Sequence, residues 1–271
     1  MKAESIIELK YSNTNTYLIR GINCNVLWDT GWAGTFNAFC SMLGEKNLKL
    51  QDIDYLFISH FHPDHMGIAG DIAKSGVNIV VCEPQIEFLH KSDIIFEKEN
   101  NKSYTPIDDQ KVKMISISES RAFLEKLGIS GEVIYTPGHS DDSISMWLNK
   151  ERALLVGDLN PLYELEMHKN TQIEKSWNDL LKLHPKTIYY GHAKTCNYSE
   201  TYMKHKTDDK TDTYKLVKRI VDLIDRGYTI YDIHDKTSAD LNFIEDVNRM
   251  YLTHQNISVQ GILDRIEIKG K

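Results

Sequence analysis

The chain has 271 residues, of which 41% are hydrophobic and 26% are charged. This composition is typical of a globular protein and excludes a disordered, collagen-like or coiled-coil chain. The chain has 32 Lys and Arg and 39 Asp and Glu, which gives a net charge of −7. This charge argues against a protein whose main role is to bind phosphate backbones or anionic lipid. The length suits one large domain, or one domain with an appendage.

The four cysteines are isolated in the sequence, at positions 24, 40, 82 and 196. Without a C-x-x-C pair they predict neither a disulfide framework nor a cysteine-rich zinc site. The first residues lack the apolar stretch of a signal peptide, and no run approaches the roughly 20 apolar residues of a membrane span. We therefore expect a cytoplasmic protein with no membrane partner.

Short β-rich runs alternate with turn signals through residue 82 and return after residue 130. Strands with their following turns are expected over 5–10, 15–20, 24–31, 54–60, 78–82, 132–138, 143–148, 152–158 and 186–192. Helices are expected over 38–46, 67–74 and 122–127, and around Trp177. Because strands and helices mix without a regular βαβ repeat, the sequence predicts an α/β protein of two mixed sheets covered by helices.

From about Thr201 the sequence becomes polar, charged and helical throughout. A turn near Thr237 to Asp240 between two helical stretches allows a helix-turn-helix, although helical hairpins are far commoner than DNA readers. The segment 201–271 carries twelve Lys and Arg and twelve Asp and Glu, so it has no basic face. We expect a helical cap or a homodimer surface here, and no nucleic-acid partner.

The most informative stretch is the loop Ser59-His-Phe-His-Pro-Asp-His-Met-Gly67, which follows an apolar strand. His60 and His62, two residues apart, project to the same side of extended backbone and can chelate one ion. A turn at Pro63 lets Asp64 and His65 face a second ion. No packing requirement explains four such side chains within six residues, so the loop predicts a metal site.

Other short motifs contribute further candidate site residues, each of which alone would be an ordinary turn residue. They are Asp29 in WDTG, His139 in TPGHS, Asp158 in GDL and His192 in YGH. Most of the remaining histidines have no chelating spacing and are interpreted as surface or packing residues; they are His90, His184, His205, His234 and His254. His168, together with Tyr163, is expected in the wall of a substrate pocket.

The H-x-H-x-D-H loop and the ordered motifs after it resemble the signature of the metallo-β-lactamase fold hydrolase superfamily. The resemblance extends from the N-terminus to about residue 195. It implies a four-layer αβ/βα sandwich of two mixed β-sheets flanked by helices. The implied domains are a catalytic domain over 1–200 and a helical C-terminal extension over 201–271.

The resemblance also implies a dinuclear site. The first metal would be held by His60, His62 and His139, and the second by Asp64, His65 and His192, with Asp158 bridging the two. Asp64 and Asp29 would have catalytic roles: Asp64 orients the attacking hydroxide or takes its proton, and Asp29 hydrogen-bonds the outer N–H of a ligand. Imidazole and carboxylate ligands suit two divalent ions, Zn²⁺ first, with iron or manganese as alternatives.

The implied function is a metal-dependent hydrolase that uses a metal-bridging hydroxide on a small-molecule ester, thioester or lactone. His62 stands where the flavodiiron branch has glutamate, and Asp158 stands where the true β-lactamases have cysteine. The chain thus looks more like the glyoxalase II and lactonase branch. The alternatives are a phosphodiesterase or nuclease of the same superfamily, and a metal-site ligand sensor whose helical tail binds a partner. Specificity is expected in the loops 86–107 and 160–175.

Overall fold

The computed structural model describes residues 5–22, 24–198 and 211–253 of the chain. These residues form two compact units. The first contains the chain up to Leu159 together with Asn170–Asn197, and the second contains Asn160–Lys169 and the chain from Tyr198 onward. The domain division predicted at residue 200 stays a prediction.

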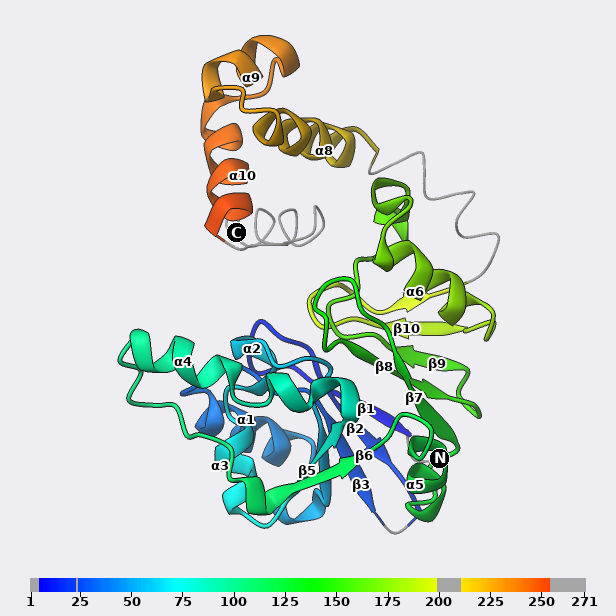
Figure 1. Ribbon diagram of the computed structural model, residues 1–271. Helices are drawn as coiled ribbons and strands as arrows, with labels where there is room; N and C mark the ends of the chain where they lie inside the picture. Colours follow the sequence, from blue (N-terminus) through cyan, green and yellow to red (C-terminus); the bar gives the residue numbers. More distant parts are fainter. Residues whose placement is uncertain (1–4, 23, 199–210, 254–271) are drawn as a thin grey trace. The chain divides into compact units, whose positions relative to one another are not determined.

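The first sheet has six strands in the spatial order β1-β2-β3-β4-β5-β6 (Figure 1). Their bounds are Ile6–Leu9, Thr16–Arg20, Asn25–Trp28, Tyr55–Phe57, Asn78–Cys82 and Val112–Ile115. β1, β2 and β3 pair antiparallel, whereas β3, β4, β5 and β6 pair parallel. The parallel half therefore brings the carboxyl ends of neighbouring strands to one edge of the sheet.

The second sheet has five strands in the order β11-β10-β9-β8-β7. Their bounds, in the same order, are Cys196–Asn197, Thr187–Tyr189, Ala153–Leu155, Ile144–Leu148 and Gly131–Tyr135. β7, β8 and β9 form an antiparallel meander, and β10 pairs parallel with β9. The strands β7, β9 and β10 consequently run in the same direction and end at the same edge.

Central strands of the first sheet are apolar on both faces, because both faces are covered. Leu27 and Leu56 belong to a core between the sheet and its helices. Val26 and Phe57, their chain neighbours, belong to the core that also holds Met146 of the second sheet. This alternation with a period of two sends successive side chains into different layers and explains the continuous hydrophobic runs in the sequence.

Helices complete the layers outside the two sheets (Figure 1). In the first unit they are α1 (Phe36–Glu45), α2 (Pro63–Met66), α3 (Ala69–Lys74), α4 (Lys91–Lys98), α5 (Ser120–Lys126) and α6 (Gln172–Leu181). Short 3₁₀ turns are η1 (Leu50–Asp52), η2 (Glu83–Phe88) and η3 (Asp109–Lys111). Phe39 of α1, Ile72 of α3 and Phe96 of α4 pack on the first sheet. In the second sheet, the ring of Trp177 in α6 lies 6.3 Å, between centroids, from that of Tyr190, which follows β10. The predicted sandwich of two mixed sheets flanked by helices is confirmed.

Two details of the first unit differ from the sequence-based expectation. The helix expected over 67–74 is preceded by a separate turn of helix, α2, because Pro63 occupies its first position and tolerates the missing N–H there. β6 and β11 were not expected as strands. β6 is an edge strand whose central residues face solvent, with Met114 64% exposed, so it lacks the apolar pattern that marks a buried strand.

The second unit contains the turn η4 (Leu162–His168) and the helices α8 (Thr211–Asp225), α9 (Ile230–Thr237) and α10 (Leu241–Thr253). The three helices enclose a small apolar core of their own, which includes Val217, Ile233 and Ile244. Thr229 begins α9 with a reciprocal cap, since its hydroxyl accepts the Asp232 N–H and the Asp232 carboxylate accepts the Thr229 N–H. The helical tail and its turn after Thr237 are as expected over these residues.

Within the described ranges, no helix combines the length and the apolar character that crossing a bilayer requires.

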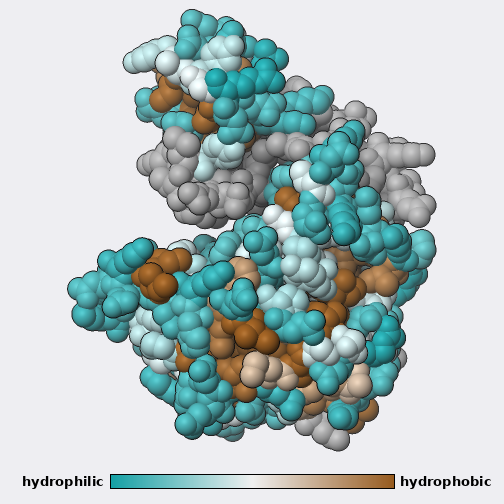
Figure 2. All heavy atoms as spheres, viewed as in Figure 1, coloured by the Kyte–Doolittle hydropathy of each residue, from teal (hydrophilic) through white to brown (hydrophobic). Residues whose placement is uncertain are grey.

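Exposed apolar side chains gather on one face of the first unit (Figure 2). Hydrophobic residues lie across its middle, and a smaller group lies on α4, where Ile94 is 54% and Ile95 42% exposed. Ile86 in η2 is also exposed. These residues fall within the loop 86–107 that the sequence marks for substrate specificity.

Alanine substitutions at two glycines with open space around them are expected to have opposite effects on the free energy of unfolding. Gly44 lies inside α1, and Gly76 has φ +104°; a Cβ at either would meet nothing within 4 Å. We expect Gly44→Ala to raise the free energy of unfolding by about 0.5–1 kcal/mol, and Gly76→Ala to lower it by about 1–2 kcal/mol. Urea unfolding measures both. Equal effects of the two substitutions would contradict the helical and left-handed backbones described here.

Candidate metal centre

The candidate ligands all follow the carboxyl ends of strands. Asp29 follows β3, and the loop containing His60 and His62 follows β4, its parallel neighbour. In the second sheet, the strands β7, β9 and β10 lead to His139, Asp158 and His192. Because these strands end at one edge of each sheet, residues that are more than a hundred positions apart in sequence meet in space.

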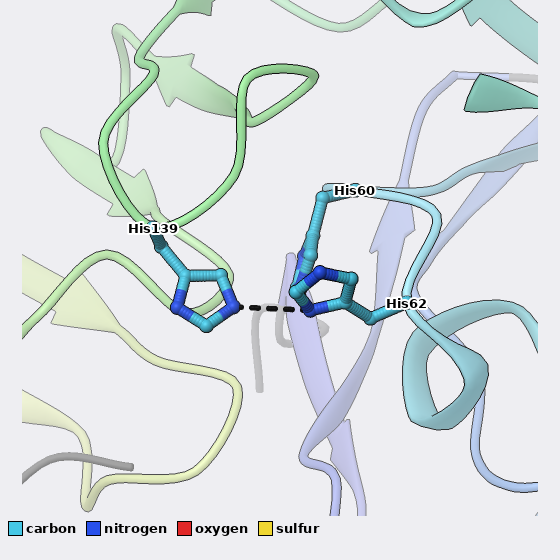
Figure 3. A group of neighbouring side chains, drawn as sticks. All are labelled: His60, His62 and His139. Carbon is cyan, nitrogen blue, oxygen red and sulfur yellow. Dashed lines mark hydrogen bonds between the residues drawn. The ribbon is translucent and has the colours of Figure 1, made fainter. Parts of the chain in front are cut away.

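His60, His62 and His139, here called the histidine trio, bring their ring nitrogens together (Figure 3). Nε2 of His60 lies 2.9 Å from Nδ1 of His62, which lies 3.2 Å from Nε2 of His139. His60 and His62 come from one loop, and His139 approaches from a facing loop (Figure 3). The sequence predicted this meeting, and the structure places the three side chains together.

Asp64, His65 and His192 form the second group. Asp64 and His65 lie on α2, one helical turn after His60. Nε2 of His192 lies 3.0 Å from Oδ2 of Asp64 and 3.3 Å from Nε2 of His65. The short helix thus brings both residues toward His192, while the centroid of the His65 ring stays 4.2 Å from that of His60 in the trio.

Asp158 lies between the two groups. Its Oδ1 is 3.2 Å from Nε2 of His65, and its Oδ2 is 3.4 Å from Nε2 of His192 and 3.7 Å from Nε2 of His139. Oδ1 is buried and accepts no hydrogen bond from any described residue. An oxygen left in this state is costly unless a cation or proton compensates it, so its position suits a bridging ligand.

Asp29 is fully buried and contacts the His65 ring. Its Oδ1 accepts the Ser59 backbone N–H at 2.6 Å, and its Oδ2 lies 3.1 Å from Nδ1 of His65. The Asp29 backbone has φ +62°, a left-handed conformation that aspartate tolerates better than most residues. The carboxylate is therefore placed to fix the tautomer and orientation of the His65 ring.

The sequence interpretation missed a polar segment that holds the second group. The Thr14 hydroxyl donates to the Asp64 carbonyl at 2.7 Å, and the Asn13 carbonyl lies 3.0 Å from Nδ1 of His192. Asn15 donates its side-chain amide to the carbonyls of Tyr190 and Ala193, on either side of Gly191 and His192. The only sequence signal was a polar run, YSNTNT, between two strands.

Position 191 has no room for a side chain, because Asp158 and His65 of the second group lie too close to its backbone. A Cβ at this position would lie 2.4 Å from Oδ1 of Asp158 and 2.8 Å from Cε1 of His65. Neither atom belongs to a flexible side chain with room to move, because both residues are held by their neighbours. The glycine before His192 therefore lets the second group and Asp158 approach one another.

The carboxylates of the site stay ionised despite burial. Burial raises the pKa of Asp64, but the charge of His65 and the hydrogen bond from His192 outweigh it and lower the pKa to about 2. Burial likewise opposes ionisation of Asp158, yet His192 and His65 hold its pKa well below the usual range. Two ionised carboxylates thus face the histidines at neutral pH.

The histidines divide into two electrostatic classes. Burial lowers the pKa of His60, His62 and His139, in the last case to about 4, so the trio is neutral at pH 7. Burial also lowers the pKa of His65 and His192, but Asp158 and the other carboxylates raise it above the ordinary value. The trio presents neutral lone pairs, and the second group attracts positive charge; both conditions favour a cation.

The donor set fits two divalent ions. Around a tetrahedral Zn²⁺ with bonds of about 2.0–2.1 Å, ligand atoms lie about 3.3 Å apart, close to the nitrogen separations of the trio. No Lys or Arg pairs with Asp29, Asp64 or Asp158 in the described part of the chain. Because these carboxylates have no Lys or Arg partner, a divalent cation would add to the positive charge that His65 and His192 supply.

The remaining predicted residues lie elsewhere. His90 is a surface residue that bonds Asp93 and Asp109, and His184 and His234 are outside the site. His205 and His254 lie outside the described residues, as does the Tyr163 side chain. His168 lies in η4, in the second unit, so its predicted place in a pocket wall stays a prediction.

Residues 10–192 match the family model of the metallo-β-lactamase superfamily. The chain therefore belongs to this superfamily, most members of which are metal-dependent hydrolases. A β-lactamase-like protein 2 homologue of Caenorhabditis elegans is 25% identical, with 93% of this chain and 80% of the relative covered. An atrochrysone carboxyl ACP thioesterase of Emericella nidulans is 27% identical over 54% of this chain and 39% of its own length.

The same fold occurs in solved structures. A metallo-β-lactamase family protein from Thermus thermophilus superposes with a TM-score of 0.58 at 20% identity, covering 79% of this chain and 81% of its own. This similarity supports the αβ/βα sandwich.

Replacing Asp29 tests its support of the site. Asp29→Ala leaves the Ser59 N–H and the His65 ring without their acceptor and places alanine at a left-handed position. We expect it to cost about 2–4 kcal/mol of unfolding free energy. Asp29→Asn, which keeps an oxygen acceptor and tolerates this backbone, should cost less than half as much. Urea unfolding of chelator-treated protein measures both, and equal losses would contradict the described contacts.

Proposed function

We propose that this protein is a dinuclear metal-dependent hydrolase of small-molecule esters, thioesters or lactones. The observation that carries the proposal is the convergence of five imidazoles and two carboxylates into two adjoining groups that share Asp158. A hydrophobic core does not require such a set, and no Lys or Arg among the described residues pairs with its carboxylates. The proposal assigns one ion to each of the two ligand sets that the family resemblance implies.

The histidine trio would hold one ion, the second group the other, and Asp158 both. Two divalent ions would supply Lewis acidity toward a carbonyl oxygen and a water that is acidic enough to react near neutral pH. Zn²⁺ is the first candidate for this nitrogen and oxygen set, with iron and manganese as alternatives. Asp29 and the segment 13–15 keep His65 and His192 in one orientation.

Asp64 is the residue proposed to handle the proton. Its side chain is 19% exposed, whereas Asp29 is fully buried, so Asp64 can be reached by water and substrate. It is ionised at neutral pH because His65 and His192 stabilise the carboxylate. These properties suit a group that orients the attacking water and accepts its proton.

An acyl substrate is favoured by the surroundings of the site. Ser92 of α4 donates its hydroxyl to the Phe61 carbonyl, so the helix with exposed Ile94 and Ile95 is attached directly to the loop of His60 and His62. Trp32, in the loop after Asp29, is 36% exposed. Apolar surface next to a polar centre suits the acyl part of an ester, thioester or lactone, and one relative is named a thioesterase.

The proposal also assigns roles to the two parts of the chain. Residues 1–200 would form the catalytic region, and residues 201–271 a helical extension that covers the active site or joins two copies of the chain. The net charge of −7 favours a small-molecule substrate in the cytoplasm over a polyanion.

The test is a substrate panel with the zinc-loaded protein. We expect turnover of a generic thioester, ester or lactone, lost by at least about 10³-fold in His60→Ala and Asp158→Ala because these substitutions remove ligands. Both variants should also retain less metal, measured by elemental analysis after desalting. His184→Ala, outside the site, is the matched control and should keep full activity and full metal content.

Three outcomes would contradict the proposal. Full turnover by chelator-treated protein would exclude a metal-dependent reaction. Turnover of bis-p-nitrophenyl phosphate alone would instead assign a phosphodiesterase. Tight binding of a metabolite without turnover of any substrate would assign a sensor.

A further inference from the structure

Asp142 is a buried carboxylate outside the seven proposed ligands. It lies in the loop between β7 and β8, three residues after His139, and is 1% exposed. Within the described part of the chain it pairs with no Lys or Arg. The neighbouring Asp141 is exposed, so these two adjacent aspartates differ in burial.

The contacts of Asp142 join two loops. Its Oδ2 accepts the Phe61 backbone N–H at 2.7 Å, and its Oδ1 accepts the Ser140 hydroxyl. Phe61 stands between His60 and His62, and Ser140 directly follows His139. One carboxylate thus connects the backbone that carries two histidines of the trio to the loop that carries the third.

Neighbouring contacts leave the Phe61 peptide little freedom. Its carbonyl accepts the Ser92 hydroxyl, and its side chain is buried. The Ser59 carbonyl accepts the Ile144 N–H at 2.8 Å. The backbone on both sides of His60 is therefore tied to the start of β8 or to Asp142, and both ties come from the second sheet.

The spacing of the trio depends on these ties, because its members come from facing loops (Figure 3). The 3.2 Å between Nδ1 of His62 and Nε2 of His139 is set by how closely the two loops approach. A fixed separation of the two loops would assist a cation among the three imidazoles.

We propose that Asp142 is a positioning residue that sets the geometry of the histidine trio by bonding the Phe61 peptide. The inference rests on the proposed function, since it assumes that the trio holds a metal. The inference also requires that Asp142 affects one metal site and not the other. Asp64 and His65 lie on α2 and are held by Thr14 and Asp29, not by Asp142. Loss of Asp142 should therefore weaken one metal site and spare the other.

The experiment is a titration of chelator-stripped protein with Co²⁺, followed by visible absorption and by calorimetry. We expect Asp142→Ala to weaken one of the two equivalents by about 10–100-fold and to leave the other within about threefold. Asp142→Asn should lose less, about 3–10-fold, because its amide oxygen can still accept the Phe61 N–H. Asp141→Ala is the matched control and should bind as the wild type does.

The outcomes separate the inference from the proposed function. Wild-type protein that binds no Co²⁺ would contradict the proposed function. Wild-type protein with two equivalents and Asp142→Ala with the same two affinities would overturn the inference alone. Equal weakening of both equivalents, with a lower melting temperature of the stripped variant, would also overturn it in favour of a general structural role. If Asp142→Ala does not fold, the Co²⁺ titration of Asp142→Asn takes its place. Unchanged affinity of this variant for both equivalents would overturn the inference.

Discussion

A cluster of carboxylates without Lys or Arg partners is the constraint on which the site depends. Asp29, Asp142 and Asp158 are carboxylates at or inside the edges of the two sheets, and none has a Lys or Arg partner in the described chain. Asp64 adds a fourth. Burying such groups is expensive unless positive charge lies close by. The fold places five imidazoles beside them, and divalent ions held there would add positive charge.

The architecture explains how one centre can draw on such distant residues. Strands β3 and β4 end beside each other in the first sheet, and β7, β9 and β10 end at one edge of the second. Stacking the sheets through the core of Phe57, Val80 and Met146 brings these edges together. The hydrophobic layers thus do more than stabilise the fold, since the distance between facing loops follows from how the sheets pack.

Much of the centre was predictable from sequence, because its ligands lie in short motifs after recognisable strands. The loop from His60 to His65 has a spacing typical of metal-ligand motifs, and the buried strands of both sheets have clear apolar patterns. The supporting residues were not predictable in this way. Thr14 and Asn15 act through hydrogen bonds to backbone groups up to 178 positions away. β6 was missed because an exposed edge strand does not need an apolar face.

The central claim is that imidazole and carboxylate side chains of this chain hold two metal ions at the shared edge of the sheets. X-ray absorption spectroscopy of the zinc-reconstituted protein, combined with elemental analysis, tests it most directly. The account predicts two equivalents per chain, with nitrogen and oxygen ligands and a multiple-scattering pattern typical of imidazole. Fewer than one equivalent per chain, or sulfur ligands from the cysteines, would contradict it.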